Sequence, residues 1–213
     1  MKKVSFMFLL SLMVLSTNLY AQNARIVSEC TIVYNLSIQD GNSTPELIQS
    51  LKGASKTVYI KGSKSRTDLV SPSYSLTIIN DSKRDTTIIL RELGSTRYMT
   101  FLDEAKKLEK NKKFEGIAFL PTSETKTILG YDCKKVVSKL KDGSTYNVYY
   151  APSIIPSTKE YEYQFKDLAG LALEYETTSE DGKMVYKFTA EKISLTPVQA
   201  AKFDTPKSGY RIL

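Results

Sequence analysis

Apolar and polar residues alternate regularly on both sides of the Asp-Gly pair at residues 181–182. Such a pair supplies the positive φ values that a two-residue hairpin turn requires. With this pair as the loop, Tyr175 faces Phe188 across the hairpin, and Glu174 and Glu176 fall on a solvated face. The opposite, apolar face carries Leu171, Leu173, Tyr175, Met184, Tyr186, Phe188 and Ala190.

A second Asp-Gly pair, at residues 142–143, predicts another hairpin between two β-prone runs. A two-residue loop would fix the register and place Val137 opposite Val148 and Lys139 opposite Tyr146. The resulting ribbon has an apolar face, which we expect to be buried. The members of that face are Cys133, Val137, Tyr146, Val148 and Tyr150.

Most of the remaining chain is a series of short β runs. Residues 24–38 alternate with period two, which predicts a first strand that has Ile26 and Cys30 on one face. Turn clusters separate the runs that follow, and connections this short require antiparallel neighbours. The runs span residues 56–61, 65–70, 74–79, 86–91 and 96–102.

Few helices interrupt these strands. A Thr-Pro pair opens residues 44–53 and again residues 196–203, and each pair combines an N-cap residue with proline at the first helical position. We therefore expect two short helices there. Residues 103–115 are rich in lysine and helix-prone or flexible, and a solvated helix or loop explains them better than an anion-binding site.

Together these elements predict a mainly β (α+β) fold. We expect a curled antiparallel sheet of about eight to ten strands, or an open half-barrel, covered by a few short helices. A sheet of this size must curl or close to protect its edges. No internal repeat or linker divides residues 22–213, so we expect one open-barrel domain.

Residues 1–21 are typical of a secretory signal peptide. Two lysines precede an apolar run at residues 4–15, and Ala21 marks the expected cleavage site. An uncleaved anchor is the alternative, but the run is shorter than the ~20 residues of a spanning helix. Cys30 lies too far from the run for lipidation. We expect a soluble periplasmic or extracellular protein, not lipidated, with no transmembrane segment in its mature chain.

Cys30 and Cys133 raise the question of a disulfide bond. An even number of cysteines in an exported chain favours a bridge. Closing a loop of about 100 residues would stabilise the fold by about 4.7 kcal/mol in the chain-entropy model. The alternative is two buried free thiols that act as small apolar side chains.

Three segments of the second half resemble a known family when they are taken together: residues 126–135 with the run Gly-Tyr-Asp-Cys-Lys-Lys, residues 149–152 and residues 168–171. The chain resembles the exported GLPGLI-type domains of unknown function from Gram-negative envelopes. It is also distantly similar to the periplasmic lipoprotein carriers, which implies a curved sheet that encloses an apolar cavity for acyl chains. Three positions depart from the GLPGLI-type pattern: Asp167, Ala169 and Ala172.

The composition excludes several kinds of catalytic chemistry. The chain has no histidine, which removes Ser-His-Asp and Cys-His nucleophile systems and histidine metal sites. Two cysteines are too few for a structural zinc site. Glu174 and Glu176 could form a glycosidase pair, but their place on the polar face opposite Lys187 favours a solvated surface. We expect a protein that is not an enzyme and holds no metal or cofactor.

Two hypotheses about function remain. The first is a carrier of a hydrophobic small molecule or lipid, because the 14 tyrosines and 8 phenylalanines could line an amphipathic cavity. The second is a structural or interaction module with a filled core, which binds an envelope protein through an edge strand or the lysines of residues 105–113. Export argues against nucleic acid as a partner. The carrier hypothesis assigns the cavity to Tyr146, Val148, Tyr150, Leu171, Leu173, Tyr175, Tyr186 and Phe188.

Overall fold

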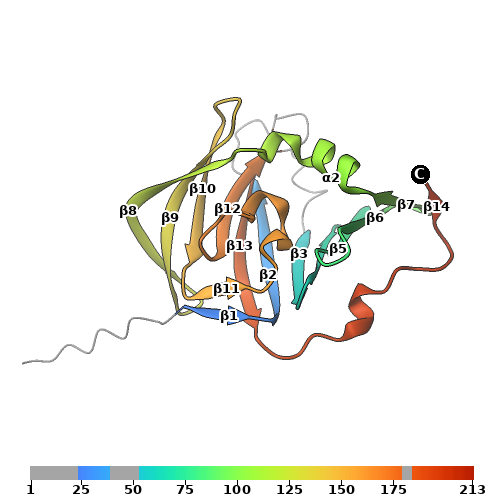
Figure 1. Ribbon diagram of the computed structural model, residues 1–213, viewed down its shortest axis with the longest axis horizontal. Helices are drawn as coiled ribbons and strands as arrows, with labels where there is room; N and C mark the ends of the chain where they lie inside the picture. The colour runs from blue at the N-terminus through green and yellow to red at the C-terminus, as the bar shows by residue number, and fades with distance from the viewer. Residues whose placement is uncertain (1–23, 39–52, 179–183) are drawn as a thin grey trace, which may run out of the picture.

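The computed structural model describes residues 24–38, 53–178 and 184–213. In this part of the chain, twelve strands form one sheet that curls without closing (Figure 1). Their order across the sheet is β14-β7-β6-β5-β4-β3-β2-β13-β12-β10-β9-β8, and two further strands, β1 and β11, form a separate parallel pair. The expected mainly β fold with an open, curled sheet is therefore confirmed, although the sheet is larger than predicted.

Strands β2 to β7 are neighbours in chain order, as are β8 to β10, and β2 lies beside β13. Only β14 joins the large sheet in parallel, beside β7. Within the described residues no helix has the length and hydropathy to span a bilayer. The strands are β1 (Arg25–Val27), β2 (Glu29–Ile38), β3 (Ser55–Lys61), β4 (Lys64–Val70), β5 (Tyr74–Asp81), β6 (Thr86–Leu93), β7 (Thr96–Leu102), β8 (Ala118–Ile128), β9 (Tyr131–Lys139), β10 (Thr145–Ala151), β11 (Ile154–Pro156), β12 (Leu171–Thr178), β13 (Val185–Ser194) and β14 (Arg211–Ile212).

The described residues contain one α-helix, α2 (Glu104–Asn111), where the sequence predicted a helix-prone or flexible segment. The helix expected at residues 44–53 lies outside the described residues, except for its last residue. The helix expected at residues 196–203 is wrong apart from its last turn. The remaining helical segments are 3-10 turns: η1 (Lys112–Phe114), η2 (Lys159–Tyr161), η3 (Tyr163–Phe165) and η4 (Ala200–Phe203).

The C-terminal segment runs across the outer face of the sheet instead of coiling into a helix. The backbone N–H of Val198 donates a 2.6 Å hydrogen bond to Glu29 Oε2, which holds the segment against β2. Val198 and Phe203 then pack with Ile79 and Leu90 in a buried apolar cluster. The segment therefore shields the outer face of β5 and β6 from water.

The predicted first strand is divided at Ser28. β2 joins the large sheet, whereas β1 turns away and pairs with β11, so that Arg25 lies beside Ile154. The division changes which side chains are buried. Ile26 is 72% exposed and Val27 is buried, so the prediction that Ile26 shares the buried face of Cys30 is wrong.

The hairpin of β12 and β13 has the predicted register. Tyr175 pairs with Phe188, and Glu176 pairs with Lys187. The turn at residues 181–182 lies outside the described residues. Strict alternation over both strands was sufficient to predict this pairing, because a slip by one residue would move every apolar side chain to the other face.

The hairpin of β9 and β10 is shifted by one residue from the prediction. Val148 pairs with Val136 instead of Val137. The Leu140 N–H bonds the Ser144 carbonyl at 2.9 Å, and Gly143, with φ at 89°, ends a turn that starts at Leu140. The loop therefore has three residues rather than two, in the arrangement of a type I turn followed by a left-handed residue.

Candidate functional site

A cavity of about 330 Å³ lies against the inner face of β4, β5 and β6. By inner face we mean the face that carries Ser65, Thr67 and Leu69, opposite the face covered by the C-terminal segment. The 3-10 helices η1 and η2, and residues 162–164 beyond η2, border the cavity together with α2. Its volume lies within the range of small-molecule binding sites.

Strand register arranges the floor of this cavity in three rows. Side chains that pair directly across antiparallel strands point to the same face, so each row crosses β4, β5 and β6 at one level. The first row is polar, the second mostly apolar and the third apolar. The rows are Ser65, Asn80 and Thr87; Thr67, Ile78 and Ile89; and Leu69 with Leu76.

The polar row is buried and partly hydrogen-bonded. Thr87 Oγ1 donates a 2.8 Å hydrogen bond to Asn80 Oδ1, and Asn80 Nδ2 donates to the Glu160 carbonyl at 3.4 Å. Ser65 is only 2% exposed, yet its hydroxyl has no hydrogen-bond partner among the described residues. The polar end of the cavity is therefore its most deeply buried part, and the Leu69 and Leu76 end is half-buried.

A compensated pair of charges forms one side wall. Lys56 Nζ lies 2.5 Å from Glu162 Oε1, and both side chains are about one-tenth exposed. Lys56 also donates a hydrogen bond to the Tyr175 hydroxyl. Its ammonium group lies 4.8 Å from the centre of the Phe188 ring and 5.0 Å from that of Tyr175, at distances where cation–π attraction stabilises a buried cation.

Helix α2 is fixed beside the cavity by a buried lysine. The Asp103 side chain caps the helix by accepting from the Lys106 N–H at 2.9 Å. One turn on, Lys107 Nζ lies 2.7 Å from Asp85 and 2.8 Å from Glu160. Burial alone would lower the pKa of Lys107, but the hydrogen bonds that it donates to these two carboxylates raise the pKa above its ordinary value. The prediction of a fully solvated lysine segment is wrong for this residue.

The eight residues predicted to line a cavity lie elsewhere, with one exception. Phe188 borders the cavity, and the other seven do not. Most of the eight belong to a packed core or lie against it. Val148, Leu171, Leu173, Tyr175 and Phe188 are buried in the core, and Tyr150 and Tyr186 are partly buried against it. Tyr146, on β10, is half-buried and is not part of this core.

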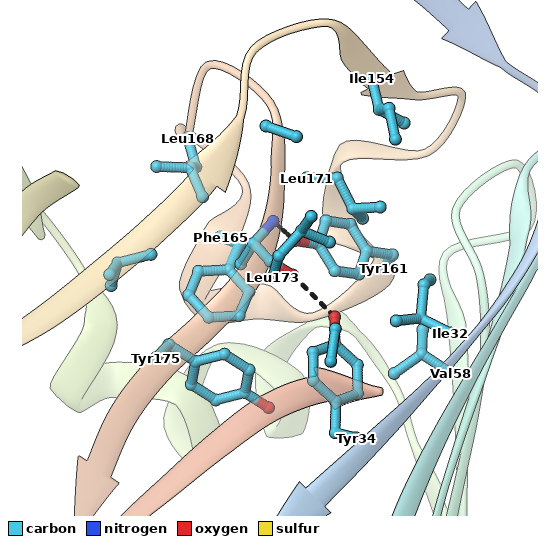
Figure 2. Close-up of a cluster of buried hydrophobic side chains, with 14 of the residues drawn as sticks. Ile32, Tyr34, Val58, Ile154, Tyr161, Phe165, Leu168, Leu171, Leu173 and Tyr175 are labelled. Carbon is cyan, nitrogen blue, oxygen red and sulfur yellow. Dashed lines mark hydrogen bonds between the residues drawn. The ribbon is translucent and has the colours of Figure 1, made fainter. Parts of the chain in front are cut away.

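The chain between β11 and β12 fills the space that the sequence analysis assigned to a ligand. Figure 2 shows Tyr161 and Phe165 seated among the side chains of this core. The Phe165 ring lies 4.9 Å from that of Tyr175 in an edge-on contact. The Tyr34 hydroxyl donates to the Ala172 carbonyl at 2.7 Å, and the Tyr161 hydroxyl accepts from the Ala172 N–H at 3.1 Å. This half of the inner face is therefore occupied by protein.

The expected disulfide bond is absent, because Cys30 and Cys133 are both buried free thiols. Three strands separate β2 from β9 in the sheet. At about 4.8 Å per neighbouring strand, the two cysteines are about 19 Å apart along the sheet. A disulfide bond requires Cα atoms within about 7 Å.

A second, polar pocket of about 270 Å³ lies on the outer side of β10, β12 and β13. Its central residue is Glu174, which is only 5% exposed, so the prediction that it is solvated is wrong. Lys126 Nζ lies 2.7 Å and Lys187 Nζ 2.9 Å from its two carboxylate oxygens. Burial raises the pKa of Glu174, but the hydrogen bonds from both lysines outweigh this and hold it below its ordinary value.

The remaining charged groups of the polar pocket also have partners, either a hydrogen-bond donor or an opposite charge. Glu176 Oε2 accepts from the backbone and side-chain nitrogens of Asn147, at 3.0 and 2.9 Å. Lys135 Nζ lies 2.7 Å from Glu124. Among the described residues no group of three or more carboxylate and cysteine side chains could hold a metal ion. The pocket is a network of compensated charges.

Sequence analysis did not identify the floor of the large cavity. β5 and β6 have apolar residues at successive positions, such as Ile78 with Ile79 and Ile88 with Ile89. Because both faces are apolar there, alternation does not show which face is covered. The one signal in the sequence that could have indicated the cavity was the row of small polar residues Ser65, Asn80 and Thr87, which lie at the same level of three adjacent strands.

No family model matches the chain, and no curated protein matches it. Solved structures with similar folds are found at low sequence identity. PNGF-II is 18% identical to this chain, with a TM-score of 0.47. The match covers 86% of this chain and 30% of PNGF-II, so the chain spans less than a third of that protein. An uncharacterized conserved protein from Thermus thermophilus is 9% identical with a TM-score of 0.47, covering 88% of this chain and 90% of that one.

A putative outer membrane lipoprotein-sorting protein domain from Vibrio parahaemolyticus is 10% identical, with a TM-score of 0.25 and coverage of 86% and 92%. The likeness to lipoprotein-sorting domains is therefore present but weak. No comparison shows a relation to the GLPGLI-type family that residues 126–171 resemble. All three TM-scores lie below 0.5, so these similarities assign neither a family nor a function to the chain.

Proposed function

We propose that the protein binds a hydrophobic or amphipathic small molecule in the cavity over β4, β5 and β6, and that it does so without catalysing a reaction. The observation that supports this proposal is the cavity itself. Its apolar lining includes Leu76, Ile78, Ile89, Leu102 and Phe114. Each methylene group that a ligand buries there gains about 0.8 kcal/mol relative to water.

A ligand in the cavity would add packing contacts to the side chains that line it. Protein interiors are close-packed, and side chains that line an apolar cavity lose the contacts they would make with neighbouring atoms. The same chain fills the other half of its inner face with Tyr161, Phe165 and Leu168. The cavity is the part of the inner face that these side chains do not cover, and it is therefore where a ligand would bind.

The proposal includes export and a place in the cell envelope. It rests on the secretory pattern of residues 1–21, which lie outside the described residues. An exported protein with a lipid-sized cavity could shield an apolar molecule from water between two membranes or outside the cell. The expected binding partner is the hydrophobic small molecule itself.

The proposal is tested by fluorescence titration with N-phenyl-1-naphthylamine, whose emission rises in apolar surroundings. We expect saturable binding to the wild type. Ile78→Trp places a large ring in the cavity and should weaken binding at least tenfold. The matched control is Val70→Trp, because Val70 is 46% exposed and does not border the cavity. Binding to this control should equal that of the wild type.

Two outcomes would overturn the proposal: no saturable binding to the wild type, or equal binding to wild type and Ile78→Trp. Circular dichroism and thermal unfolding verify that each variant is folded. If Ile78→Trp does not fold, Leu76→Trp replaces it, since the half-buried third row accommodates a larger ring with less strain.

The filled core around Tyr175 favours a second candidate, the interaction module without a ligand. In that case the cavity has no role in function, and the working surface is an edge strand or the exposed lysines of α2 and η1. The absence of saturable probe binding, together with loss of partner capture after neutralisation of Lys106 and Lys110, would support this candidate.

A further inference from the structure

We infer that the ligand is an uncharged amphiphile whose hydrogen-bonding head group lies against the polar row of Ser65, Asn80 and Thr87, with its apolar chain directed toward Leu69 and Leu76. This inference rests on the proposed function and adds the chemical class and the orientation of the ligand. A long-chain alcohol or a monoacylglycerol is a molecule of this class.

The polar row lies at one level of the cavity floor. Ser65 pairs directly with Asn80, and Asn80 pairs directly with Thr87. Neighbouring strands lie about 4.8 Å apart, so the three side chains span about 10 Å at one level of the floor. All three border the cavity. A head group with two or three polar atoms fits a row of this length.

Ser65 supplies a hydroxyl that is available to a ligand. The residue is only 2% exposed and borders the cavity, and none of the hydrogen bonds among the described residues involves its side chain. The one fully buried side-chain oxygen without a hydrogen bond among these residues is Glu162 Oε1, so the Ser65 hydroxyl keeps access to the cavity. A polar ligand group would pair with this hydroxyl, whereas an apolar chain would leave it unpaired. Thr67, one level further along β4, also borders the cavity with no hydrogen bond from its hydroxyl to a described residue. A hydroxyl or carbonyl of the ligand would pair with them.

The charged side chains near the polar row are already compensated. Next to the polar row, Lys107 already lies between the carboxylates of Asp85 and Glu160. At the side wall, Lys56 is compensated by Glu162. An anionic head at the polar row would meet one cation and two carboxylates, and a buried charge without its own partner is strongly unfavourable. An uncharged head requires no such compensation.

A ligand in the reverse orientation, with its head group at the opening of the cavity, would depend on Lys110 instead of the polar row. Lys110 borders the cavity from the last turn of α2, is exposed, and has no ion-pair partner among the described residues. A fatty acid with its carboxylate outward would pair with Lys110 and leave the Ser65 hydroxyl against an apolar chain end. The two orientations therefore depend on different residues and can be separated by substitution.

The test is displacement of N-phenyl-1-naphthylamine by three twelve-carbon competitors below their critical micelle concentrations: 1-monolauroylglycerol, laurate and dodecylamine, at pH 8. We expect monolauroylglycerol to displace the probe at a concentration at least tenfold lower than either charged competitor. Ser65→Ala should remove most of this preference, measured as the ratio between the displacing concentrations of the three competitors in the same variant. Lys110→Ala, the matched control, should leave the preference intact.

The inference is overturned if laurate or dodecylamine displaces the probe as well as monolauroylglycerol does, or if Ser65→Ala leaves the preference unchanged. Loss of laurate binding in Lys110→Ala would establish the reverse orientation instead. Thr87→Val provides a second variant at the polar row if Ser65→Ala does not fold. Failure of the proposed function is distinguishable, because the wild type would then not bind the probe at all.

Discussion

Lys56 Nζ, on β3, lies 2.5 Å from Glu162 Oε1, on the segment between η2 and η3. The contact is an ion pair between two side chains that are each about one-tenth exposed. It stands at the boundary between the two halves of the inner face. On one side lies the cavity, and on the other lies the core around Tyr175, whose hydroxyl accepts a hydrogen bond from Lys56.

Removing one partner of this pair should destabilise the fold strongly. Lys56→Met leaves the Glu162 carboxylate buried without a cation, and we expect a loss of about 3–5 kcal/mol in the free energy of unfolding. The double variant Lys56→Met, Glu162→Gln should recover much of that loss, because no charge then remains buried. Urea denaturation of the three proteins measures both effects.

The matched control for this prediction is Lys61→Met. Lys61 lies on β3, as Lys56 does, and its Nζ is 2.8 Å from Glu29 Oε1 on β2. Both of these side chains are about one-third exposed. Solvent and salt screen such a pair, so its loss should have a much smaller effect. Equal destabilisation by Lys56→Met and Lys61→Met would contradict this explanation of the buried pair.

The two cysteines should react slowly with thiol reagents in the folded protein. Burial raises the pKa of the Cys30 thiol to about 12 and that of Cys133 to about 11. The reactive thiolate is then at least about 100-fold rarer at pH 8 than in the unfolded chain. Ellman's reagent should label neither thiol in buffer and both in 6 M guanidinium chloride. An intact mass two protons below the reduced value would instead reveal a disulfide bond.

The same raised pKa values predict that stability falls in alkali. The buried neutral thiols favour the folded state fully below the unfolded pKa of about 9, and this contribution is lost as the pH rises through 11 to 12. Urea midpoints at pH 8, 9.5 and 10.5 should fall more steeply for the wild type than for the Cys30→Ala, Cys133→Ala variant. Parallel curves would show that the thiols do not contribute.

Glu174 should stabilise the fold at neutral pH and lose this effect in acid. Its pKa is lowered in the folded state, so its contribution is present above the unfolded pKa of about 4.3 and disappears as the pH falls through the lower folded value. Glu174→Gln should cost about 1–3 kcal/mol at pH 7. The stability difference between wild type and variant should shrink below about pH 4.3. Glu191→Gln, at an exposed position on β13, should have no effect.

Gly170 should tolerate no side chain. A Cβ atom at this position would lie 2.8 Å from Tyr150 Cδ2 and closer still to the Ala151 carbonyl oxygen. Gly170→Ala therefore forces the start of β12 away from β10, at a cost of about 1–3 kcal/mol. Ala169→Ser, at the exposed neighbouring residue, should leave the thermal midpoint unchanged. An unchanged midpoint for Gly170→Ala would refute the close approach of the two strands.

The sequence was most informative where one face of a strand is apolar and the other polar. The pairing of Tyr175 with Phe188 followed from alternation alone. The hairpin at residues 142–143 was off by one residue because an Asp-Gly pair fits loops of two or three residues. The loop has three residues when the Leu140 N–H donates a hydrogen bond to the Ser144 carbonyl, and the local sequence does not determine whether this bond forms.

The site depended on contacts between distant segments, and sequence patterns do not record these. Glu174 is buried because Lys126, three strands away in the sheet order, reaches it across the curled sheet. The predicted cavity residues form a core because Tyr161 and Phe165 fill the space above them. The same segment reaches β5, where Asn80 donates to the Glu160 carbonyl, but it borders the cavity over β4, β5 and β6 instead of filling it.

The most direct test of the central claim, that the cavity over β4, β5 and β6 holds an apolar molecule, is native mass spectrometry of the protein purified from its own cells. Wild type and Ile78→Trp are compared before and after mild organic extraction. The claim predicts a discrete added mass on the wild type that leaves on extraction and is missing from Ile78→Trp. A bare mass for the wild type, or an added mass that both proteins retain equally, would contradict it.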